Sequence, residues 1–410
     1  MNIVCLGYTV ELRDILMKYM VLTGSFITQF MVVGVLFSYG VLMNEFEIQF
    51  GWPRAVLSTA SSGAFILMGV LVLCVGYLSD RYSPRLLLSI TGLLFGLGVA
   101  STSFITAPIH LILIVCIFVG IGMSTHDVVT LSSIAKSFDK RLGIMTGITK
   151  TGAAMGQVCI PPFLALLIIL FEWKQAIAIL GILSGFILLI AASMMRISSQ
   201  ATLIKTTEVS GMWAKEARKT VTFWKLGSIQ FLFFSALMTI PVHIAIHGID
   251  LGMSPAKASL LLSAIGFASI AGRIVIGFSV DRLGARVTYI ICFCPLILSL
   301  FAYREISSHT PLFIITLLYG FSHGSFFTVV SPAVKEYFGM KSHGDIFGNL
   351  LFLGTIGGAI CPIIAGLIFD RSGSYDLAFL GLAIFASIGL IMSLLLPSYR
   401  EKSLHITTNI

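Results

Sequence analysis

Ionisable side chains inside long apolar runs are the residues of this sequence best suited to chemistry. Arg273 lies about two-thirds along the apolar run 258–280, too deep to reach either end of it easily. A guanidinium binds a carboxylate through two parallel hydrogen bonds, and a charge buried in lipid is costly without a function. The sequence therefore predicts that Arg273 binds a substrate carboxylate. The alternative is a structural pair with a helix carbonyl or with Asp127.

A second polar pair, His126 and Asp127, lies in the inner half of the run 109–132. Because histidine titrates near physiological pH, both residues are candidates for proton coupling or for an inner gate. The alternative is that Asp127 pairs with a base near the cytoplasmic end, either Lys150 or Lys136. Lys150 itself lies about two turns into its own apolar run, so its long side chain is expected to extend to the inner membrane surface.

Two further histidines, His243 and His247, are four residues apart and share one helical face near an outer end. They are either proton-coupling residues or ordinary packing histidines. The segment lacks the glutamate of a metalloprotease helix, and no metal site is expected. His323 lies near the middle of another run, and with Tyr319 it is a candidate to line a substrate cavity. Three uncharged polar residues in other runs are candidates for the same cavity wall: Asn349, Gln29 and Gln230.

The composition excludes most soluble functions. Of 410 residues, 57% are hydrophobic and only 11% are charged, whereas a soluble domain carries about 25% charged residues. A cytosolic enzyme or a nucleic-acid-binding protein would need a charged surface that this chain cannot make. The sequence also contains no phosphate loop, dinucleotide fingerprint or nucleophile elbow, so neither an enzyme, a cofactor nor ATP-driven transport is expected. The seven cysteines form no CxxC pair, and no disulfide or zinc framework is expected.

Twelve apolar runs are each long enough to cross a bilayer as a helix, which takes about 20 residues. They are rich in Leu, Ile, Phe and Gly without strict alternation, which favours helices over the strands of a membrane barrel. The predicted class is an all-α integral membrane protein with twelve transmembrane helices, at 19–41, 56–78, 86–106, 109–132, 144–169, 176–196, 222–247, 258–280, 286–304, 311–334, 345–368 and 376–397.

The placement of Lys and Arg sets the predicted orientation. With the N-terminus inside, nineteen of the 26 basic residues fall in cytoplasmic segments, five in outer loops and two within spans. Both termini are therefore predicted to be cytoplasmic, in a plasma or inner membrane, and the net charge of +8 is attributed to basic inner loops. The first run has no small-residue cleavage site close behind it, so it is expected to be a retained helix.

The longest polar stretch, 197–221, divides the spans into an N-terminal six-helix bundle (1–196) and a C-terminal six-helix bundle (222–410). This stretch is expected to be a cytoplasmic linker, with a short amphipathic helix at 211–219 on the anionic inner leaflet.

The two bundles are internal repeats, because one offset of 201 residues relates three separated segments. Six spans per half is an even number, so both halves keep the same orientation. Parallel repeats of this kind place a substrate site between the halves near the midplane and favour alternating access. The matched segments are 51–58 with 252–259, 76–85 with 277–286, and 147–161 with 348–362.

The segment after the second span and its copy after the eighth resemble the inner-loop signature of the major facilitator superfamily. The first copy has Ser83 where glycine is usual, whereas the second has Gly284. The resemblance covers the whole chain and implies the major facilitator fold, with two pseudo-symmetric halves and an inner gate latched by acids that pair with basic groups and helix termini. The alternative is ordinary positive-inside loop charge. The matching gate residues are Asp80, Arg81 and Arg85, and Asp281, Arg282 and Arg286, each set following a glycine, Gly76 or Gly277.

Other segments resemble the monocarboxylate and oxalate/formate porter branch of that superfamily. They are GWPRAVLS after the first span, Arg273 in the eighth, the Gly-rich fifth span, and FGMKSHGDIFGNLLFLGTIGGAICP at the eleventh. Ser269 stands one turn before Arg273, where many animal members carry an aspartate. The segment LFSYG (36–40) lacks the lysine that those members carry in the first span. The proton relay of those members is therefore not expected here in the same form.

These residues predict a secondary transporter of a small organic anion, a monocarboxylate such as lactate, pyruvate or formate, which works by proton symport or anion exchange. An anion is favoured because Arg273 and several histidines stand against one buried acid, Asp127. A proton-driven exporter of amphipathic compounds is the alternative, since 31 phenylalanines can line a promiscuous cavity. A sensor built on a transporter scaffold is a third hypothesis, which the short tails disfavour. The expected partners are the organic anion, a proton or counter-anion and the lipid bilayer, with no nucleic acid.

Overall fold

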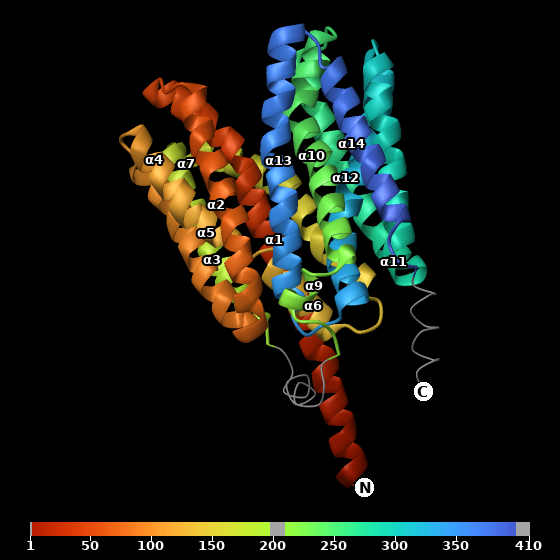
Figure 1. The fold of residues 1–410 in the computed structure, drawn as a ribbon. Coiled ribbons are helices and arrows are strands. Elements are labelled where there is room, and N and C mark those ends of the chain that lie inside the picture. Colours follow the sequence, from red (N-terminus) through yellow and green to blue (C-terminus); the bar gives the residue numbers. More distant parts are fainter. Residues whose placement is uncertain (1, 197–209, 399–410) are drawn as a thin grey trace. The chain divides into compact units, whose positions relative to one another are not determined.

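The computed structural model describes residues 2–196 and 210–398 (Figure 1). In this part of the chain, ten helices are long and apolar enough to cross a membrane. Two of them, α7 (Leu142–Met194) and α11 (Pro255–Glu305), each contain a kink at one non-helical residue, Glu172 and Gly284 respectively. Each of these two helices therefore supplies two crossings, and the twelve-helix, all-α fold expected from the sequence is confirmed.

The other crossings follow the chain in order, and the fourth is composite. It consists of α4 (Pro108–Ile114), the π-helix η2 (Val115–Val119), α5 (Gly120–Met123) and α6 (Val128–Ser137). The single-helix crossings are α1 (Asn2–Phe50), α2 (Arg54–Arg81), α3 (Pro84–Ser101), α10 (Val221–Asp250), α12 (His309–Phe338), α13 (His343–Ser372) and α14 (Asp376–Leu394), and a 3₁₀ turn, η1 (Thr102–Phe104), follows α3.

Unusual backbone angles recur at the repeat offset of 201 residues. Gly51 and Gly252 have positive φ angles of 65° and 87°, each just before a crossing begins. Glu172 and Gly373 form a second pair at the same offset, with φ angles of 59° and 69°. Such angles cost glycine little but strain a residue that carries a side chain. The repeat inferred from the sequence therefore extends to the backbone of the turns.

The chain divides into two compact units. Unit 1 comprises Met1–Met145, Thr149–Gly211 and Gly339–Gly348, and unit 2 comprises Thr146–Ile148, Met212–Phe338 and Asn349–Ile410. Two short segments are assigned to one unit, although most of the helix that contains each of them is assigned to the other unit. Thr146–Ile148 joins unit 2, and the first turns of α13 join unit 1.

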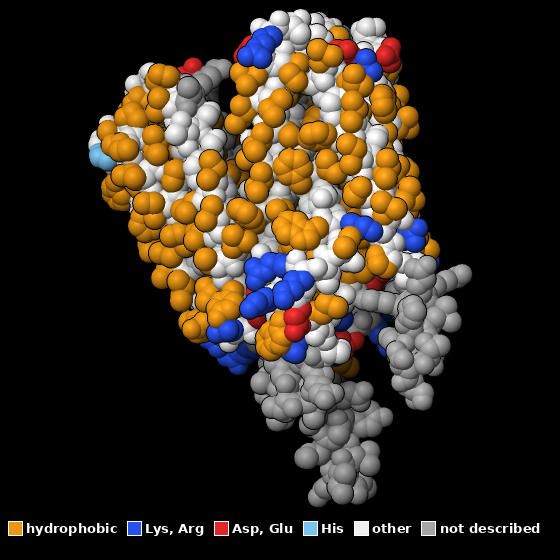
Figure 2. Space-filling view, in the orientation of Figure 1, with side chains coloured by type: hydrophobic (Ala, Val, Ile, Leu, Met, Phe, Trp, Pro, Cys, Tyr) orange, Lys and Arg blue, Asp and Glu red, His pale blue; other side chains and the backbone are white. Residues whose placement is uncertain are grey.

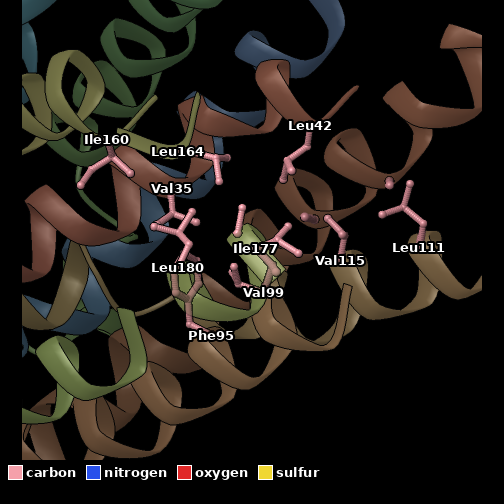
Figure 3. Packing of buried hydrophobic residues seen from close by; sticks show 14 of the residues in the cluster. Val35, Leu42, Phe95, Val99, Leu111, Val115, Ile160, Leu164, Ile177 and Leu180 are labelled. Atoms are coloured by element: carbon pink, nitrogen blue, oxygen red, sulfur yellow. The ribbon is translucent and has the colours of Figure 1, made fainter. Parts of the chain in front are cut away.

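A continuous apolar core fills unit 1 (Figure 3). Four aromatic side chains pack together at one end of this core. Phe46 meets Trp173 edge-on with ring centroids 5.3 Å apart, and Phe50 stacks on Trp52 with centroids 4.3 Å apart. Each such aromatic pair contributes about 0.5–1.5 kcal/mol beyond its buried area. The core side chains come from α1, α2, the third and fourth crossings and α7, and they include Val35, Leu42, Phe95, Val99, Leu111, Val115, Ile160, Leu164, Ile177 and Leu180.

Unit 2 has its own aromatic core. Phe233 of α10 stacks on Phe326 of α12 at 3.8 Å between ring centroids, and Phe293 of α11 meets both rings. The helices α11 and α12 approach closely where Gly272 lies, because a Cβ there would collide with the backbone oxygen of Phe321. Small residues at such contacts let membrane helices pack tightly without a hydrophobic driving force between them.

The outer faces of the long helices carry large apolar side chains, which cover most of the face seen in Figure 2. Ile169, Phe267 and Ile363 are 80%, 74% and 65% exposed. A soluble protein rarely exposes a continuous apolar surface of this size, whereas lipid requires one.

The predicted linker is described only from residue 210 onward, and its part at 197–209 lies outside the described residues. The amphipathic helix expected at 211–219 is reduced to the short α9 (Ala214–Ala217), near which Lys and Arg side chains gather in Figure 2. The Glu216 carboxylate accepts the backbone N–H of Trp213 at 2.9 Å. Gly211 pairs with Gly339 in an isolated β-bridge, so this part of the linker lies beside the loop before α13.

Candidate functional site

The fourth crossing, which carries His126 and Asp127, is not a regular helix. Val115–Val119 forms a π-helix, and the residues between Met123 and Val128 form turns that separate α5 from α6. Irregular backbone at membrane depth is tolerated only where it is buried in protein or lines a cavity, and π-bulges are frequent at functional sites. The break therefore frees backbone carbonyls for partners outside their own helix.

Asp127 and Lys150 form a buried ion pair within unit 1. Nζ of Lys150 lies 2.5 Å from Oδ1 of Asp127, and the two side chains are 4% and 15% exposed. Lys150 points into the bundle because a charge-assisted hydrogen bond to a carboxylate is available there. The expectation that its side chain extends to the inner membrane surface is wrong. The pairing of Asp127 with Lys150, one of the alternatives raised by the sequence, is present.

Gln29 of α1 joins this pair to the broken crossing. Its Nε2 lies 2.9 Å from the backbone oxygen of His126, 2.9 Å from Oδ1 of Asp127 and 3.1 Å from Oγ1 of Thr130. Its Oε1 accepts from Nζ of Lys150 at 3.3 Å, and this contact fixes which end of the amide faces the lysine. Gln29 and the pair His126–Asp127, which two separate sequence signals proposed, thus lie in one network.

The imidazole of His126 is oriented by its partners. Nδ1 lies 2.5 Å from the backbone oxygen of Met123, which can only accept, so Nδ1 carries the proton and donates it. Nε2 lies 3.6 Å from Oδ2 of Asp127. The ring nitrogen able to take up a second proton therefore faces the carboxylate.

Unit 2 contains a counterpart of Gln29 with different surroundings. Gln230 of α10 lies 201 residues after Gln29 and is therefore its equivalent in the second repeat. The three matched segments of the sequence do not include this pair. Both of its amide atoms, and Oγ1 of Thr328 on α12, are buried without a hydrogen-bond partner among the described residues. The rings of Phe234 and Phe327 meet at 5.4 Å, so α10 and α12 are packed together one turn away. Buried unsatisfied polar groups each cost about 1–3 kcal/mol, and each needs an explanation.

Arg273 lies in the first half of α11 and is 4% exposed. Gly147, which belongs to unit 2, packs against it, since a Cβ there would collide with the backbone oxygen of Arg273. The same Cβ would lie 3.5 Å from Cγ2 of Thr328. The backbone of Arg273 and the side chain of Thr328 therefore flank one glycine.

His243 is held by two partners within unit 2. Its Nε2 lies 3.0 Å from the backbone oxygen of Pro362, to which it donates, and its Nδ1 accepts from the Tyr375 hydroxyl at 3.1 Å. His247 packs edge-on against the rings of Tyr375 and Phe379, at 5.9 and 5.2 Å. These contacts are the ones expected of packing histidines, the alternative that the sequence raised beside proton coupling.

Tyr319 and His323 lie together on α12, with ring centroids 6.0 Å apart. Tyr319 is fully buried, and its hydroxyl donates to two backbone oxygens of α10 at 3.1 and 3.2 Å. The hydroxyl is therefore committed to helix packing, whereas the His323 ring lies one turn further along. Asn349 accepts a hydrogen bond from Arg218 at 3.4 Å, which places it beside the end of the linker.

Asp80 caps the first turn of α13, whose residues 343–348 belong to unit 1. Its carboxylate oxygens accept the backbone N–H groups of Gly344 and Asp345 at 3.1 and 3.0 Å, and Oδ1 lies 3.2 Å from Nζ of Lys136. A carboxylate is stabilised at a helix N-terminus by the helix dipole. Gly76 permits the approach, because a Cβ there would lie 2.7 Å from the Gly344 backbone oxygen.

The second copy of this loop turns differently. Gly284 has a φ angle of 76°, whereas Ser83 has a φ angle of −66° and its hydroxyl accepts the N–H of Leu86 as the N-cap of α3. A serine suffices in the first copy because the backbone there is not left-handed. Of the other gate residues, Arg81, Arg85, Asp281 and Arg282 are exposed, and Arg286 is half-buried.

Metal-ligating groups are not gathered anywhere in residues 2–196 and 210–398, since no three His, Cys, Asp or Glu side chains there are placed to hold an ion.

Comparison with known proteins defines the class. The family description "Major Facilitator Superfamily" matches residues 25–250 and 226–408, which together span most of the sequence. The chain belongs to this superfamily of secondary transporters. It is therefore a multi-pass integral membrane transporter and not an enzyme.

Individual proteins of known name are similar to this chain over most of its length. The rat (Rattus norvegicus) protein "Monocarboxylate transporter 13" is 25% identical over 394 residues, covering 92% of this chain and 88% of that protein. The human (Homo sapiens) "Monocarboxylate transporter 12" is 24% identical over 429 residues, covering 94% of this chain and 82% of that protein. Among solved structures, the proton:xylose symporter XylE superposes with a TM-score of 0.74 at 14% identity, over 93% of this chain and 96% of that one, which shows the shared fold.

Proposed function

We propose that the protein transports a small organic anion, a monocarboxylate such as lactate, pyruvate or formate, by alternating access. The observation that carries the proposal is the buried guanidinium of Arg273 in unit 2. A fixed cation of this shape binds a carboxylate through two parallel hydrogen bonds. The relatives named as monocarboxylate transporters support the same substrate class.

Gln230 and Thr328 supply neutral hydrogen-bonding groups in the same unit. Their buried polar atoms have no partner in the described part of the chain, so a bound molecule with a hydroxyl or carbonyl group would satisfy them. Ligand sites combine an apolar wall with a few placed polar groups of this kind. We include His323 and Tyr319 in this set as neighbours on α12, and Gln29 and Asn349 as further candidates.

Transport is coupled to a proton or to a counter-anion. Of the four coupling candidates, His126 and Asp127 form a network with a lysine, whereas both ring nitrogens of His243 are used in helix contacts and His247 packs among aromatic rings. We assign coupling to His126 and Asp127 first. Asp80, Arg81 and Arg85, with Asp281, Arg282 and Arg286, form the inner gate in this proposal.

The experiment that tests the substrate class uses Arg273→Lys, which keeps the charge but loses the planar fork. A charge-assisted hydrogen bond contributes about 1.5–3 kcal/mol, so pyruvate binding should weaken about tenfold or more, while binding of its amide changes little. Binding is measured on purified protein at equal folded fraction, with Arg304→Lys in the same helix as the control. Normal pyruvate binding by Arg273→Lys would make the arginine structural and remove the main support for an anion.

We also propose that both termini and the linker face the cytoplasm of a plasma or inner membrane, because basic residues dominate those segments. Ser210 is exposed and lies at the described end of the linker. A cysteine placed there by Ser210→Cys should react with an impermeant thiol reagent only in inside-out vesicles, in a background that lacks the native cysteines. Reaction in intact cells would reverse the assignment.

A further inference from the structure

The segment where the linker joins α10 combines basic side chains with large exposed apolar ones. Trp213 and Trp224 are 54% and 57% exposed, and Val221, the first residue of α10, is 70% exposed. Three exposed basic residues lie between the two tryptophans in the sequence. We name this set the linker patch, and it comprises Trp213, Lys215, Arg218, Lys219, Val221 and Trp224.

The backbone under the linker patch is fixed to unit 2. Ala214 and Ala217 of α9 are 3% and 0% exposed, so one side of this short helix is buried. Nε1 of Trp224 donates to the backbone oxygen of Arg218 at 3.0 Å, which ties the first turns of α10 to α9. The backbone N–H of Met212 donates to a backbone oxygen at the end of α12 at 2.9 Å. The side chains of the linker patch therefore stand on a defined surface.

The three cations of the linker patch lie on one side of a helical turn. The backbone N–H groups of Arg218 and Lys219 donate to oxygens four and three residues earlier, so the turn of α9 continues through both. With Lys215, these residues have the spacing i, i+3 and i+4 of a shared helical face. The one acid of residues 210–225, Glu216, accepts the backbone N–H of Trp213 at 2.9 Å. The outward charge is therefore positive, as the Lys and Arg side chains near α9 in Figure 2 indicate.

This combination of side chains is typical of the boundary between a membrane and water. Tryptophan is enriched at that boundary because its ring is apolar and its N–H is polar, and basic residues there attract acidic headgroups. The crossing α10 begins at Val221, and Trp224 lies in its first turn. A soluble anion would contact the cations alone. A phospholipid would contact the cations with its headgroup and the apolar side chains with its acyl chains.

We propose that the linker patch binds the headgroup of an acidic phospholipid such as phosphatidylserine. The guanidinium of Arg218 matches a phosphate through parallel hydrogen bonds, and Lys215 and Lys219 add compact charges that attract the headgroup. Nη1 of Arg218 lies 3.4 Å from Oδ1 of Asn349, a contact that uses one of the five N–H donors of the guanidinium. The inference concerns a lipid partner and is independent of the transported substrate.

The test measures how strongly phosphatidylserine binds to the purified full-length protein in detergent. Trp52→Phe/Trp173→Phe leaves Trp213 and Trp224 as the only tryptophans of the chain. Phospholipids with brominated acyl chains quench tryptophan fluorescence on contact. Each basic residue near an acidic lipid strengthens binding about fivefold. Brominated phosphatidylserine should therefore quench at concentrations about fivefold or more below those of brominated phosphatidylcholine.

Two variants in this background locate the site. Arg218→Gln should weaken binding of phosphatidylserine about fivefold, and Lys215→Gln/Lys219→Gln about tenfold or more, with phosphatidylcholine unchanged in both. The control is Arg371→Gln, which removes an exposed arginine at the opposite end of α13 from Asn349 and should change neither lipid. Binding is compared at equal folded fraction. Equal quenching by the two lipids, or a full preference for phosphatidylserine in both linker-patch variants, overturns the proposal.

A competition arm separates a lipid from a soluble anion. Glycerophosphoserine carries the same headgroup without acyl chains, so it should displace brominated phosphatidylserine only at concentrations more than about tenfold higher. Displacement at equal concentrations would show that the cations bind a soluble anion and would overturn the assignment to a lipid. Raising the salt concentration to about 1 M should remove the preference for phosphatidylserine, because exposed charges are then screened. A preference that persists at this salt concentration would exclude the cations as its cause.

Discussion

Gln29 and Gln230 occupy equivalent places in the two repeats but have opposite surroundings. Gln29 has four groups of unit 1 within hydrogen-bonding distance, whereas both amide atoms of Gln230 are buried without a partner among the residues described. At the same offset, Asp127 is matched by Thr328 and Lys150 by Leu351. One repeat thus has charged residues that contact its glutamine, and the other has neutral residues at the equivalent positions.

The backbone follows the same division. The fourth crossing of unit 1 is interrupted by a π-helix and a turn, whereas its counterpart α12 is helical from His309 to Phe338. The broken crossing carries a polar network, and the continuous one carries the stacked Phe326. A duplicated fold therefore does not imply duplicated chemistry. We assign proton binding to the satisfied repeat and substrate binding to the unsatisfied one.

The largest effect that tests this division comes from replacing each glutamine by leucine. Gln29→Leu strands the donors and acceptors of its network, so it should lower the free energy of unfolding by about 1–3 kcal/mol. Gln230→Leu removes polar atoms that have no partner in the described part of the chain, so it should stabilise the substrate-free protein by a similar amount and weaken substrate binding. Thermal unfolding of both purified variants, with and without pyruvate, gives the comparison. Equal destabilisation by the two substitutions would remove the contrast.

A smaller difference is expected between the two gate acids. Asp80 accepts two backbone N–H groups of α13, whereas Asp281 is exposed. Loss of a carboxylate cap costs about 1 kcal/mol, so Asp80→Asn should speed amide hydrogen exchange at residues 343–346 by about fivefold. Asp281→Asn should leave exchange there unchanged. Hydrogen exchange at these residues is measured by mass spectrometry on the two variants. Equal protection in both would show that Asp80 does not stabilise the first turn of α13.

The smallest effect concerns the turn at Glu172. Its backbone adopts φ 59° and ψ 157°, a region that suits glycine, and the equivalent residue of the other repeat is Gly373. Glu172→Gly should therefore raise the stability of the protein by up to about 1 kcal/mol. The measurement is a thermal unfolding curve, with Glu172→Ala as the control, because alanine removes the carboxylate but keeps a Cβ at the same φ angle. A lower melting temperature for Glu172→Gly would mean that the side chain outweighs the strain.

The fold was predictable because hydropathy, charge bias and repeats are properties of single segments. Each of the twelve crossings contains an apolar run, and the kinks at Glu172 and Gly284 fall in the gaps between runs. The break before α6 was not predicted, because the run 109–132 is long enough for one helix. The four polar residues 124–127 in its inner half were the available signal.

The members of the candidate site were predicted from the sequence, whereas the pairing of Asp127 with Lys150 was raised only as one of two alternatives. Asp127 and Gln29 were named one by one, while the position of Lys150 depends on which neighbouring helix faces it. The length of the lysine side chain, taken alone, predicted that the ammonium group reaches the membrane surface, because a long side chain near a helix end can reach water. A carboxylate on another helix, 23 residues away in sequence, determines the outcome instead.

The amide of Gln29 leaves its network with more than one arrangement. Nε2 carries two hydrogens, yet three acceptors lie within 3.1 Å of it, on His126, Asp127 and Thr130. At any instant one of the three receives no full bond, and which one is left out can change by a small rotation. Such degeneracy lowers the barrier to redistributing the bonds when the carboxylate changes its charge. The Gln29 amide can then donate to Thr130 and to the His126 carbonyl and keep both hydrogens bonded. The same side chain therefore accommodates both charge states of Asp127.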